Sequence, residues 1–276
     1  MDLQQVMFTP TLTHSAMFYA RQLSCYNFCV HICDTNDSYM CMWHEGIAGR
    51  GANEIASCLF KVLQLGSISK RHLNIWCDNC AGQNKNRMVL FVLMYLVAKC
   101  CYLKIALKFL VSGHSYMACD RDFGLIEKRK RVMKAMIPSE LQDVVKSARI
   151  VKPFKVVNME SNDFFDISSH ANDFISTTKL NISKASVIQI EAKNPSRIKI
   201  KTTFSDIAPW EEVQVLKKGR KASDIAALQL RKQSSHNRIS EEKKKDLLGM
   251  MPYLEEKYHS FYRNLCSDRP TDMEQE

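Results

Sequence analysis

The alternation of hydrophobic and polar positions predicts strands and helices in turn over residues 1–135. Residues 26–33 alternate with a period of two, which is typical of a half-buried strand. The turn-forming cluster at 34–38 and the apolar stretch at 39–44 predict a second strand that returns beside the first. The other elements predicted here are strands at 1–6, 72–77 and 103–111 and helices at 52–65, 84–99 and 119–135. This order predicts an α/β fold with a mixed five-stranded sheet and flanking helices.

The second half of the chain has a different pattern. Pro138 and Pro153 interrupt it, and residues 150–216 are rich in β-forming residues. The elements predicted here are alternating strands at 187–190 and 197–202 and helices at 221–231 and 240–251, the last with Ser240 at its start. We therefore expect three parts: a core at 1–140, a small β-rich appendage at 141–220 and a helical C-terminal segment at 221–276.

Composition narrows the class of protein. Of the 276 residues 46% are hydrophobic and 25% charged, as in soluble globular proteins. The longest apolar run, 88–98, is shorter than the roughly 18 residues of a membrane span, so no membrane partner is expected. Residues 1–5 do not resemble a signal peptide. Eleven cysteines without such a signal favour a reducing, intracellular compartment and free thiols.

Charge points to a polyanionic partner. Lys and Arg (39) exceed Asp and Glu (29), which gives a formal net charge of +10. A basic run of Lys128, Arg129, Lys130 and Arg131 lies in a predicted helix, and 217–221 form a second run. Such runs contact DNA backbones or direct nuclear import, which predicts a nuclear location. The alternative is a solvated helix face, because four consecutive helical residues point in different directions.

Three acidic positions lie where a strand ends or a neighbouring helix begins. Asp2 is on the first predicted strand, Asp78 follows the strand at 72–77, and Asp120 and Asp122 open the helix at 119–135. Carboxylates at one edge of a sheet can hold Mg²⁺ or Mn²⁺, which prefer oxygen ligands. Each residue also has an ordinary explanation, as a solvated terminus, a turn former or a helix N-cap.

Three motifs carry a resemblance to known proteins. They are Asp2-Leu-Gln-Gln, residues 78–86 (DNCAGQNKN) and residues 113–127 (GHSYMACDRDFGLIE). The chain resembles a widespread animal family related to transposon proteins, whose domain is similar to the RNase H-like domain of DDE transposases and integrases. The resemblance covers roughly residues 1–265.

This resemblance implies a catalytic function. It implies an RNase H-like core in which Asp2, Asp78 and Asp120 bind Mg²⁺ or Mn²⁺ for cleavage or strand transfer of a phosphodiester, with DNA as the partner. Asp122 and Glu127 are rivals for the third position. Only Met1 precedes Asp2, so the core is expected to be truncated and to lack the N-terminal DNA-binding module of a transposase. The alternative is a domesticated or decayed transposase fragment that binds nucleic acid or protein without catalysis.

Two further residues are candidates beside the acidic positions. Lys85 follows Asp78 at a predicted helix start, where backbone N–H groups and an ammonium suit a phosphate. The alternative there is helix capping by Asn84. His114, six residues before Asp120, is a candidate for positioning a phosphate or transferring a proton. A histidine held in a loop by hydrogen bonds is the alternative.

The cysteines do not predict zinc. Cys77 and Cys80 form a Cys-x-x-Cys pair without the usual second half. Cys25, Cys29 and Cys33 share one strand face, but residues four apart on a strand are about 13 Å apart. Thiolates bound to one zinc ion must be far closer, so we expect small buried thiols and no zinc.

Overall fold

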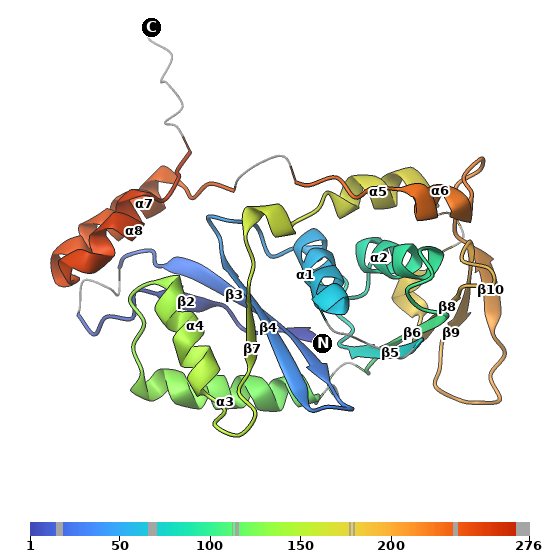
Figure 1. The fold of residues 1–276 in the computed structure, drawn as a ribbon, viewed down its shortest axis with the longest axis horizontal. Coiled ribbons are helices and arrows are strands. Elements are labelled where there is room, and N and C mark those ends of the chain that lie inside the picture. Colours follow the sequence, from blue (N-terminus) through green and yellow to red (C-terminus); the bar gives the residue numbers. More distant parts are fainter. Residues whose placement is uncertain are drawn as a thin grey trace, which may run out of the picture. The chain divides into compact units, whose positions relative to one another are not determined.

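The computed structural model describes residues 1–14, 19–65, 71–111, 113, 116–176, 178, 180–233 and 237–268 (Figure 1). The protein is a mixed α/β structure that divides into two compact units. Unit 1 comprises residues 1–2, 50–118 and 162–234, and unit 2 comprises residues 3–49, 119–161 and 235–276. No helix in the described ranges is long and apolar enough to cross a membrane.

Unit 1 contains a sheet with the strand order β10-β9-β8-β6-β5. Its strands are β5 (His72–Cys77), β6 (Lys104–Phe109), β8 (Val187–Glu191), β9 (Arg197–Lys201) and β10 (Glu211–Gln214). The strands β5 and β6 are parallel, and the other neighbours are antiparallel. The parallel pair requires a crossover, which the chain makes through the helix α2 (Arg87–Ala98).

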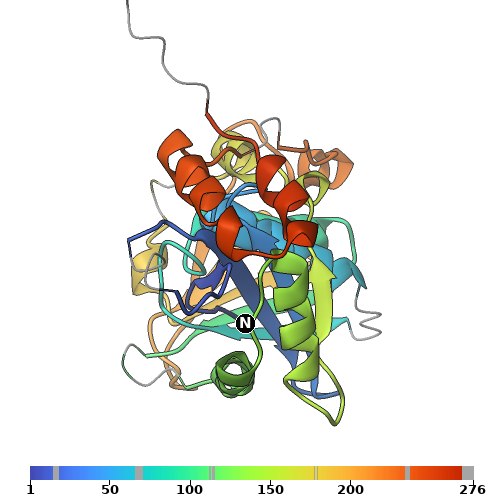
Figure 2. The same ribbon diagram turned by 90° about the vertical axis from the view of Figure 1, so that its left-hand side faces the viewer.

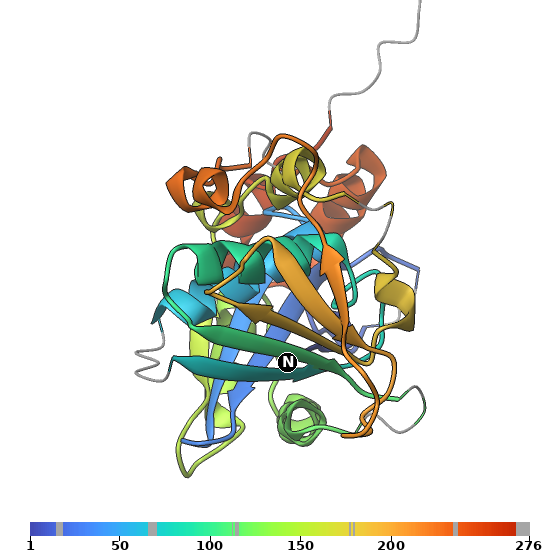
Figure 3. The same cartoon turned by 90° about the vertical axis from the view of Figure 1, so that its right-hand side faces the viewer.

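The helices of unit 1 lie on one side of this sheet (Figures 1 and 3). Besides α2 they are α1 (Ala52–Leu65), α5 (Ile167–Phe174) and α6 (Ala222–Ala227). The sequence of α2 is apolar on nearly every side, and such a helix is stable only when it is surrounded. It packs against the other three helices and against β6 and β8, so it forms the centre of the unit 1 core.

Unit 2 is built on a hairpin of β3 (Leu23–Ile32) and β4 (Asp37–His44), which turns at Asn36 in the left-handed region. The strand β7 (Lys155–Asn158) joins β4 in parallel. On the other side of the hairpin, β1 (Asp2–Leu3) and β2 (Met7–Thr9) both neighbour β3. Of the two residues of β1, Asp2 is assigned to unit 1 and Leu3 to unit 2.

Two apolar clusters hold the helices of unit 2, whose ribbons are visible in Figure 2. The helices are α3 (Ala118–Val132), α4 (Pro138–Ser147), α7 (Glu241–Gly249) and α8 (His259–Arg263). Side chains of α3 and α4 form one cluster with β3 and β4, and α7 and α8 form the other around Tyr262. Short 3-10 turns lie at Ser161–Asp163, Ile182–Lys184, Met251–Tyr253 and Glu256–Tyr258.

The structure confirms most elements predicted for residues 1–135. The helix at 52–65 and the strand at 72–77 have the predicted bounds. The helix predicted at 84–99 begins only at Arg87, because Asn86 is its N-cap. The strand predicted at 1–6 is limited to Asp2–Leu3, and β2 was not predicted because three residues are too few to show a period.

The second half differs from the predicted arrangement. The strands expected at 187–190 and 197–202 exist, but they do not form an appendage, because β8 pairs with β6 and β7 pairs with β4. Periodicity identifies a strand and does not identify its neighbour. Each unit combines three separate chain segments. The segment 119–161 of unit 2 continues across the expected boundary near 140, and the segment 162–234 of unit 1 continues across the one near 220. The helix α7 begins as predicted, with Ser240 Oγ accepting from the Lys243 N–H at 3.3 Å.

Candidate functional site

Asp78 directly follows β5 in unit 1, at the start of the loop that leads to α2. Its Oδ1 atom accepts hydrogen bonds from the backbone N–H of Cys80 at 3.2 Å and from Nδ2 of Asn84 at 2.7 Å. The first of these bonds is an Asx turn, the ordinary role of an aspartate after a strand. The second fixes the direction of the carboxylate, because Asn84 is itself buried.

The amide oxygen of Asn84 is an unusual feature of this loop. Asn84 Oδ1 is buried and has no hydrogen-bond partner among the described residues. Rotation of the amide would not help, because it would bring this oxygen against the carboxylate of Asp78. A buried polar atom without a hydrogen-bond partner costs free energy. The loop therefore keeps an unused acceptor, the amide oxygen of Asn84, in the residue that also bonds to the carboxylate of Asp78.

Lys85 is held in the same loop. Its side chain is buried, Nζ donates to Asn79 Oδ1 at 2.7 Å and lies 4.9 Å from the centroid of the Phe109 ring. Burial lowers the pKa of Lys85, because the charged form loses hydration. The ammonium group of Lys85 therefore anchors the loop through Asn79. The phosphate contact expected from the sequence would be a second role of the same group.

The N-terminus of α2 is capped by Asn86. Its Oδ1 accepts from the N–H groups of Met88 at 3.0 Å and Val89 at 3.1 Å. The alternative explanation for this segment, a cap at Asn84, is therefore wrong, since the side chain of Asn84 points to Asp78 instead.

Asp2 lies close to the end of β5. The amino nitrogen of Met1 donates to the carbonyl oxygen of Trp76 at 2.8 Å, one residue before Cys77. Burial raises the pKa of the Cys77 thiol to about 12, and the carboxylates of Asp78 and Asp2 act in the same direction. The bond from Met1 to Trp76 brings Asp2 to the end of β5 that Asp78 directly follows, and this region of unit 1 is here called the Asp78 corner.

The donors of the Asp78 corner are oxygen atoms. The carboxylates of Asp2 and Asp78 and the amide oxygen of Asn84 are ligands of the kind that Mg²⁺ and Mn²⁺ prefer. Among the residues that the structure describes, no group of three His, Cys, Asp or Glu side chains is placed to hold a metal ion. The donor types alone would suit a divalent ion, with the amide oxygen of Asn84 as a candidate ligand beside the two carboxylates.

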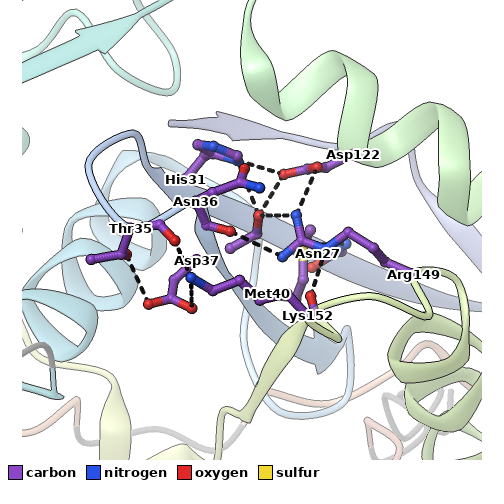
Figure 4. A network of polar contacts seen from close by, with 10 residues as sticks. Asn27, His31, Thr35, Asn36, Asp37, Met40, Asp122, Arg149 and Lys152 are labelled. Carbon is purple, nitrogen blue, oxygen red and sulfur yellow. Dashed lines mark hydrogen bonds and ion pairs between the residues drawn. The ribbon is translucent and has the colours of Figure 1, made fainter.

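Asp122 belongs to a buried network in unit 2 (Figure 4). Its Oδ2 atom contacts His31 Nδ1 at 2.8 Å and accepts from Ser38 Oγ at 2.6 Å. Its Oδ1 atom lies 3.5 Å from Arg149 Nη1. Ser38 also contacts His31 Nδ1, at 3.0 Å, so serine and aspartate share one ring nitrogen. A nucleophilic triad places them on opposite nitrogens, so this network is no such triad.

These partners explain Asp122 as a structural residue. The side chain is only 2% exposed, and both carboxylate oxygens have partners. It ties α3 to the β3–β4 hairpin and to Arg149, whose guanidinium also lies 4.4 Å from the Phe154 ring centroid.

The remaining acidic candidates lie on α3. Glu127 Oε1 accepts from Gln4 Nε2 at 2.8 Å and from Lys130 Nζ at 3.0 Å. Asp120 is half-buried in the first turn of α3, where a carboxylate is favourable to the helix dipole. It belongs to unit 2, whereas Asp2 and Asp78 belong to unit 1. His114 lies outside the described residues.

The basic run on α3 is divided by the helix. Lys130 pairs with Glu127, and Arg129 Nε donates to Ser147 Oγ at 3.1 Å. Lys128 and Arg131 are exposed. The run at 217–221 is exposed, with Arg220 placed 4.8 Å from the Phe174 ring centroid. About half of the first run is thus engaged within unit 2.

Two features of these sites were not predicted. The first is the contact of Asn84 with Asp78, which their six-residue separation across a turn and a helix start could have suggested. The second is the network of Asp122, whose partners come from distant strands and leave no local signal. All eleven cysteines are free thiols, as expected.

Comparison with known proteins gives one match. Residues 28–206 match a family model described as Domain of unknown function (DUF7869). No curated protein and no solved structure matches the chain. The matched region takes up more than half of the 276 residues.

Proposed function

We propose that this chain, which belongs to the DUF7869 family, is a transposase-derived protein that cleaves or transfers phosphodiesters of DNA with a divalent metal ion. The observation that carries the proposal is that Asp78, held by Asn84, directly follows β5, and that the bond from Met1 to Trp76 brings Asp2 to the same end of this strand. An acidic pair at the carboxyl end of a parallel strand, directly before a helix, suits metal-dependent chemistry.

The fold supports an RNase H-like core as part of this proposal. A mixed sheet is expected for such a core, and each unit has one. The parallel pair β5–β6 is joined through α2, and the antiparallel pair β3–β4 forms a hairpin. The formal net charge of +10 supports DNA as the partner, and with it a nuclear location.

Each residue of the Asp78 corner has a distinct part in the proposed chemistry. Asp2, Asp78 and Asn84 Oδ1 would hold Mg²⁺ or Mn²⁺, which activates a water or hydroxyl group and stabilises the leaving oxygen. Lys85 fixes the loop through Asn79 and brings positive charge near the phosphate. The third acidic residue of the proposal, Asp120, enters on the sequence prediction alone.

A non-catalytic binding module is the second candidate. It is favoured by the Asx turn of Asp78, which explains this residue without any metal, and by the lack of a three-ligand group among the described residues. In this case the basic surface would bind nucleic acid or protein, and the acidic residues would only support the loop.

Nuclease activity and metal binding separate these candidates. We expect the protein to cleave DNA in Mn²⁺ and Asp78→Asn to remove measurable cleavage. Asp173→Asn, an exposed residue of the same unit, is the matched control and should cleave normally. Mn²⁺ binding, followed by electron paramagnetic resonance, should weaken in Asp78→Asn and in Asn84→Ala. Full activity in Asp78→Asn would refute the site, and an inactive wild type that binds DNA would establish the second candidate.

The third acidic residue needs single substitutions. Asp120→Asn should remove cleavage while the protein stays folded. Glu127→Gln should cleave normally, because Glu127 serves Gln4 and Lys130. If Asp120→Asn cleaves normally and Glu127→Gln loses cleavage, Glu127 and not Asp120 is the third acidic residue.

A further inference from the structure

The sheet of unit 1 has a polar outer face that the proposed chemistry does not use. Here the outer face is the side opposite the buried isoleucines of β5, β6, β8 and β9, with the helices of unit 1 on the isoleucine side (Figure 3). The strand register places four outer residues in one row across four strands: Trp76, Lys108, Val187 and Lys201. The second row on this face is Asn74, Ala106, Gln189 and Lys199.

Three aromatic side chains are exposed around the first row. Trp76 is 41% exposed, and Phe204 and Trp210, from the connection between β9 and β10, are 43% and 40% exposed. The rings of Trp76 and Phe204 stack with their centroids 5.6 Å apart and an interplanar angle of 25°. Large aromatic residues at a surface are commonly found where a partner binds.

Lysines alternate with these rings. Lys108 Nζ lies 4.9 Å from the Trp76 ring centroid, and Lys201 Nζ lies 5.0 Å from that of Trp210. Lys201 also donates to the carbonyl oxygens of Ser205 at 2.9 Å and Asp206 at 3.2 Å, which fixes the aromatic connection against the sheet. A hollow of about 220 Å³ lies among these side chains and reaches Lys104.

The positive charge of this face is only partly neutralised. Lys199 pairs with Glu191 at 3.3 Å, and Arg197 lies 4.0 Å from Glu212. Within the described ranges, neither Lys104 nor Lys108 has an acidic partner within ion-pair distance. These two cations lie on one strand, each two residues from Ala106, and they line the hollow beside the exposed rings.

We propose that the outer face of the unit 1 sheet binds single-stranded nucleic acid. Unpaired bases stack on exposed aromatic rings, and lysines beside them neutralise the phosphates. A duplex hides the faces of its bases and would use only the lysines. An acidic peptide would also use the lysines, but it would gain nothing from the stacked pair of Trp76 and Phe204.

The binding does not depend on the acidic residues of the proposed active site. Its test therefore uses EDTA, so that no metal ion takes part. The full chain is titrated with a fluorescein-labelled oligothymidylate, with the same strand paired to its complement, and with polyglutamate as an acidic competitor. Tryptophan fluorescence reports the same binding, because Trp76 and Trp210 are exposed while Trp43, the third tryptophan, is buried.

Substitution of the rings tests the stacking. Trp76→Leu and Trp210→Leu should each weaken binding of the single strand at least fivefold, and Trp76→Phe should retain binding within about threefold, because each stacked base contributes at least about 1 kcal/mol. The far-ultraviolet circular dichroism of all variants should match that of the wild type. Wild-type affinity in both leucine variants with unchanged folding would overturn the proposal.

Substitution of the lysines tests the phosphate contacts. Lys104→Ala/Lys108→Ala should reduce the salt slope of single-strand binding by about 1.4, since each phosphate contact contributes about 0.7. Lys146→Ala/Lys245→Ala, two exposed helical residues of unit 2, removes the same charge as a matched control and should change the slope little.

Equal affinity for the duplex, or displacement of the oligonucleotide by equimolar polyglutamate, would instead assign the face to another anionic partner. If Asp78→Asn loses cleavage and still binds the single strand, the result supports both proposals and shows that single-strand binding does not depend on the Asp78 corner.

Discussion

Two buried carboxylate clusters of this protein differ in how completely their oxygens are used. In unit 2, Asp122 is almost fully buried, and each oxygen meets a donor from His31, Ser38 or Arg149. In unit 1, Asp78 is half-buried, and its neighbour Asn84 keeps a buried oxygen without a partner in the described part of the chain. In the first cluster the protein supplies hydrogen-bond donors to both carboxylate oxygens of Asp122, whereas in the second the amide oxygen of Asn84 remains an unused acceptor.

The two aspartates are distinguished by this difference better than by sequence position. Asp78 directly follows a strand and Asp122 lies near the start of a helix, and both were candidates for the same catalytic set. A carboxylate with all its donors in place stabilises the fold, whereas a loop that keeps an acceptor unsatisfied costs free energy unless a ligand completes it. The comparison therefore predicts a large loss of stability on substitution of Asp122 and a small change on substitution of Asp78.

The largest effect is expected for Asp122→Ala. Removal of the carboxylate leaves the mostly buried side chains of Arg149 and His31 without their acidic partner, and breaking a buried pair costs about 3–5 kcal/mol. Urea unfolding followed by circular dichroism measures the change. Asp143→Ala, an exposed acidic residue on α4, is the control and should lose less than about 1 kcal/mol. A loss below about 1 kcal/mol in Asp122→Ala would show that the network is dispensable.

A second prediction concerns a polar group of unit 2 that has no partner. Nδ1 of His44 is buried without a hydrogen-bond partner among the described residues, and burial lowers the pKa of His44 to about 4. The unfolded chain, with a pKa near 6.5, binds the proton first, so His44 makes stability fall as the pH drops from about 6.5 to 4. The total loss is about 3 kcal/mol.

His44→Phe keeps an aromatic ring beside Phe261 and removes the titrating group. Its stability between pH 6.5 and 4 should fall by about 3 kcal/mol less than that of the wild type, in urea unfolding repeated across this range. His72→Gln, an exposed residue on β5, serves as the control and should follow the wild type. Parallel pH curves for His44→Phe and the wild type would refute the assignment.

Local elements could be predicted from the sequence because their signals are local. The stripe of apolar residues in α1 and the apolar run of β5 fixed the bounds of both elements. The partners of β7 and β8 could not be predicted, because pairing joins strands separated by more than 70 residues. The five strands expected in one core sheet are therefore divided between two sheets, with β1, β3 and β4 in one and β5 and β6 in the other.

The same limit applies to the candidate site. Position after a strand identified Asp78, and the start of a helix identified Asp120 and Asp122 as equivalent candidates. What distinguishes Asp122 is its contact with His31 and Ser38, 91 and 84 residues away. The orphaned oxygen of Asn84 depends on side-chain direction, which no spacing rule specifies.

A smaller effect on stability is expected for Asp78→Asn. Asparagine keeps the oxygen that accepts the Asx-turn bond from Cys80, and the substitution removes a negative charge close to that of Asp2. The free energy of unfolding should change by less than about 1 kcal/mol, in either direction. A loss as large as that of Asp122→Ala would show that Asp78, too, is a structural residue.

The smallest effect concerns the basic run on α3. Because Lys130 pairs with Glu127 and Arg129 bonds to Ser147, only Lys128 and Arg131 are exposed for phosphate contacts. Lys128→Ala/Arg131→Ala should therefore weaken binding to duplex DNA of any sequence and reduce the salt slope by up to about 1.8, since each phosphate contact contributes about 0.9. Fluorescence anisotropy of a labelled duplex at several salt concentrations measures both.

The matched variant Arg129→Ala/Lys130→Ala removes the same charge from the same helix, and alanine preserves the helix. It should leave the salt slope almost unchanged and lower stability slightly, because both side chains are engaged within unit 2. Equal losses in the two variants would mean that DNA senses only the total charge of α3. An unchanged slope in Lys128→Ala/Arg131→Ala would remove this helix from the DNA-binding surface.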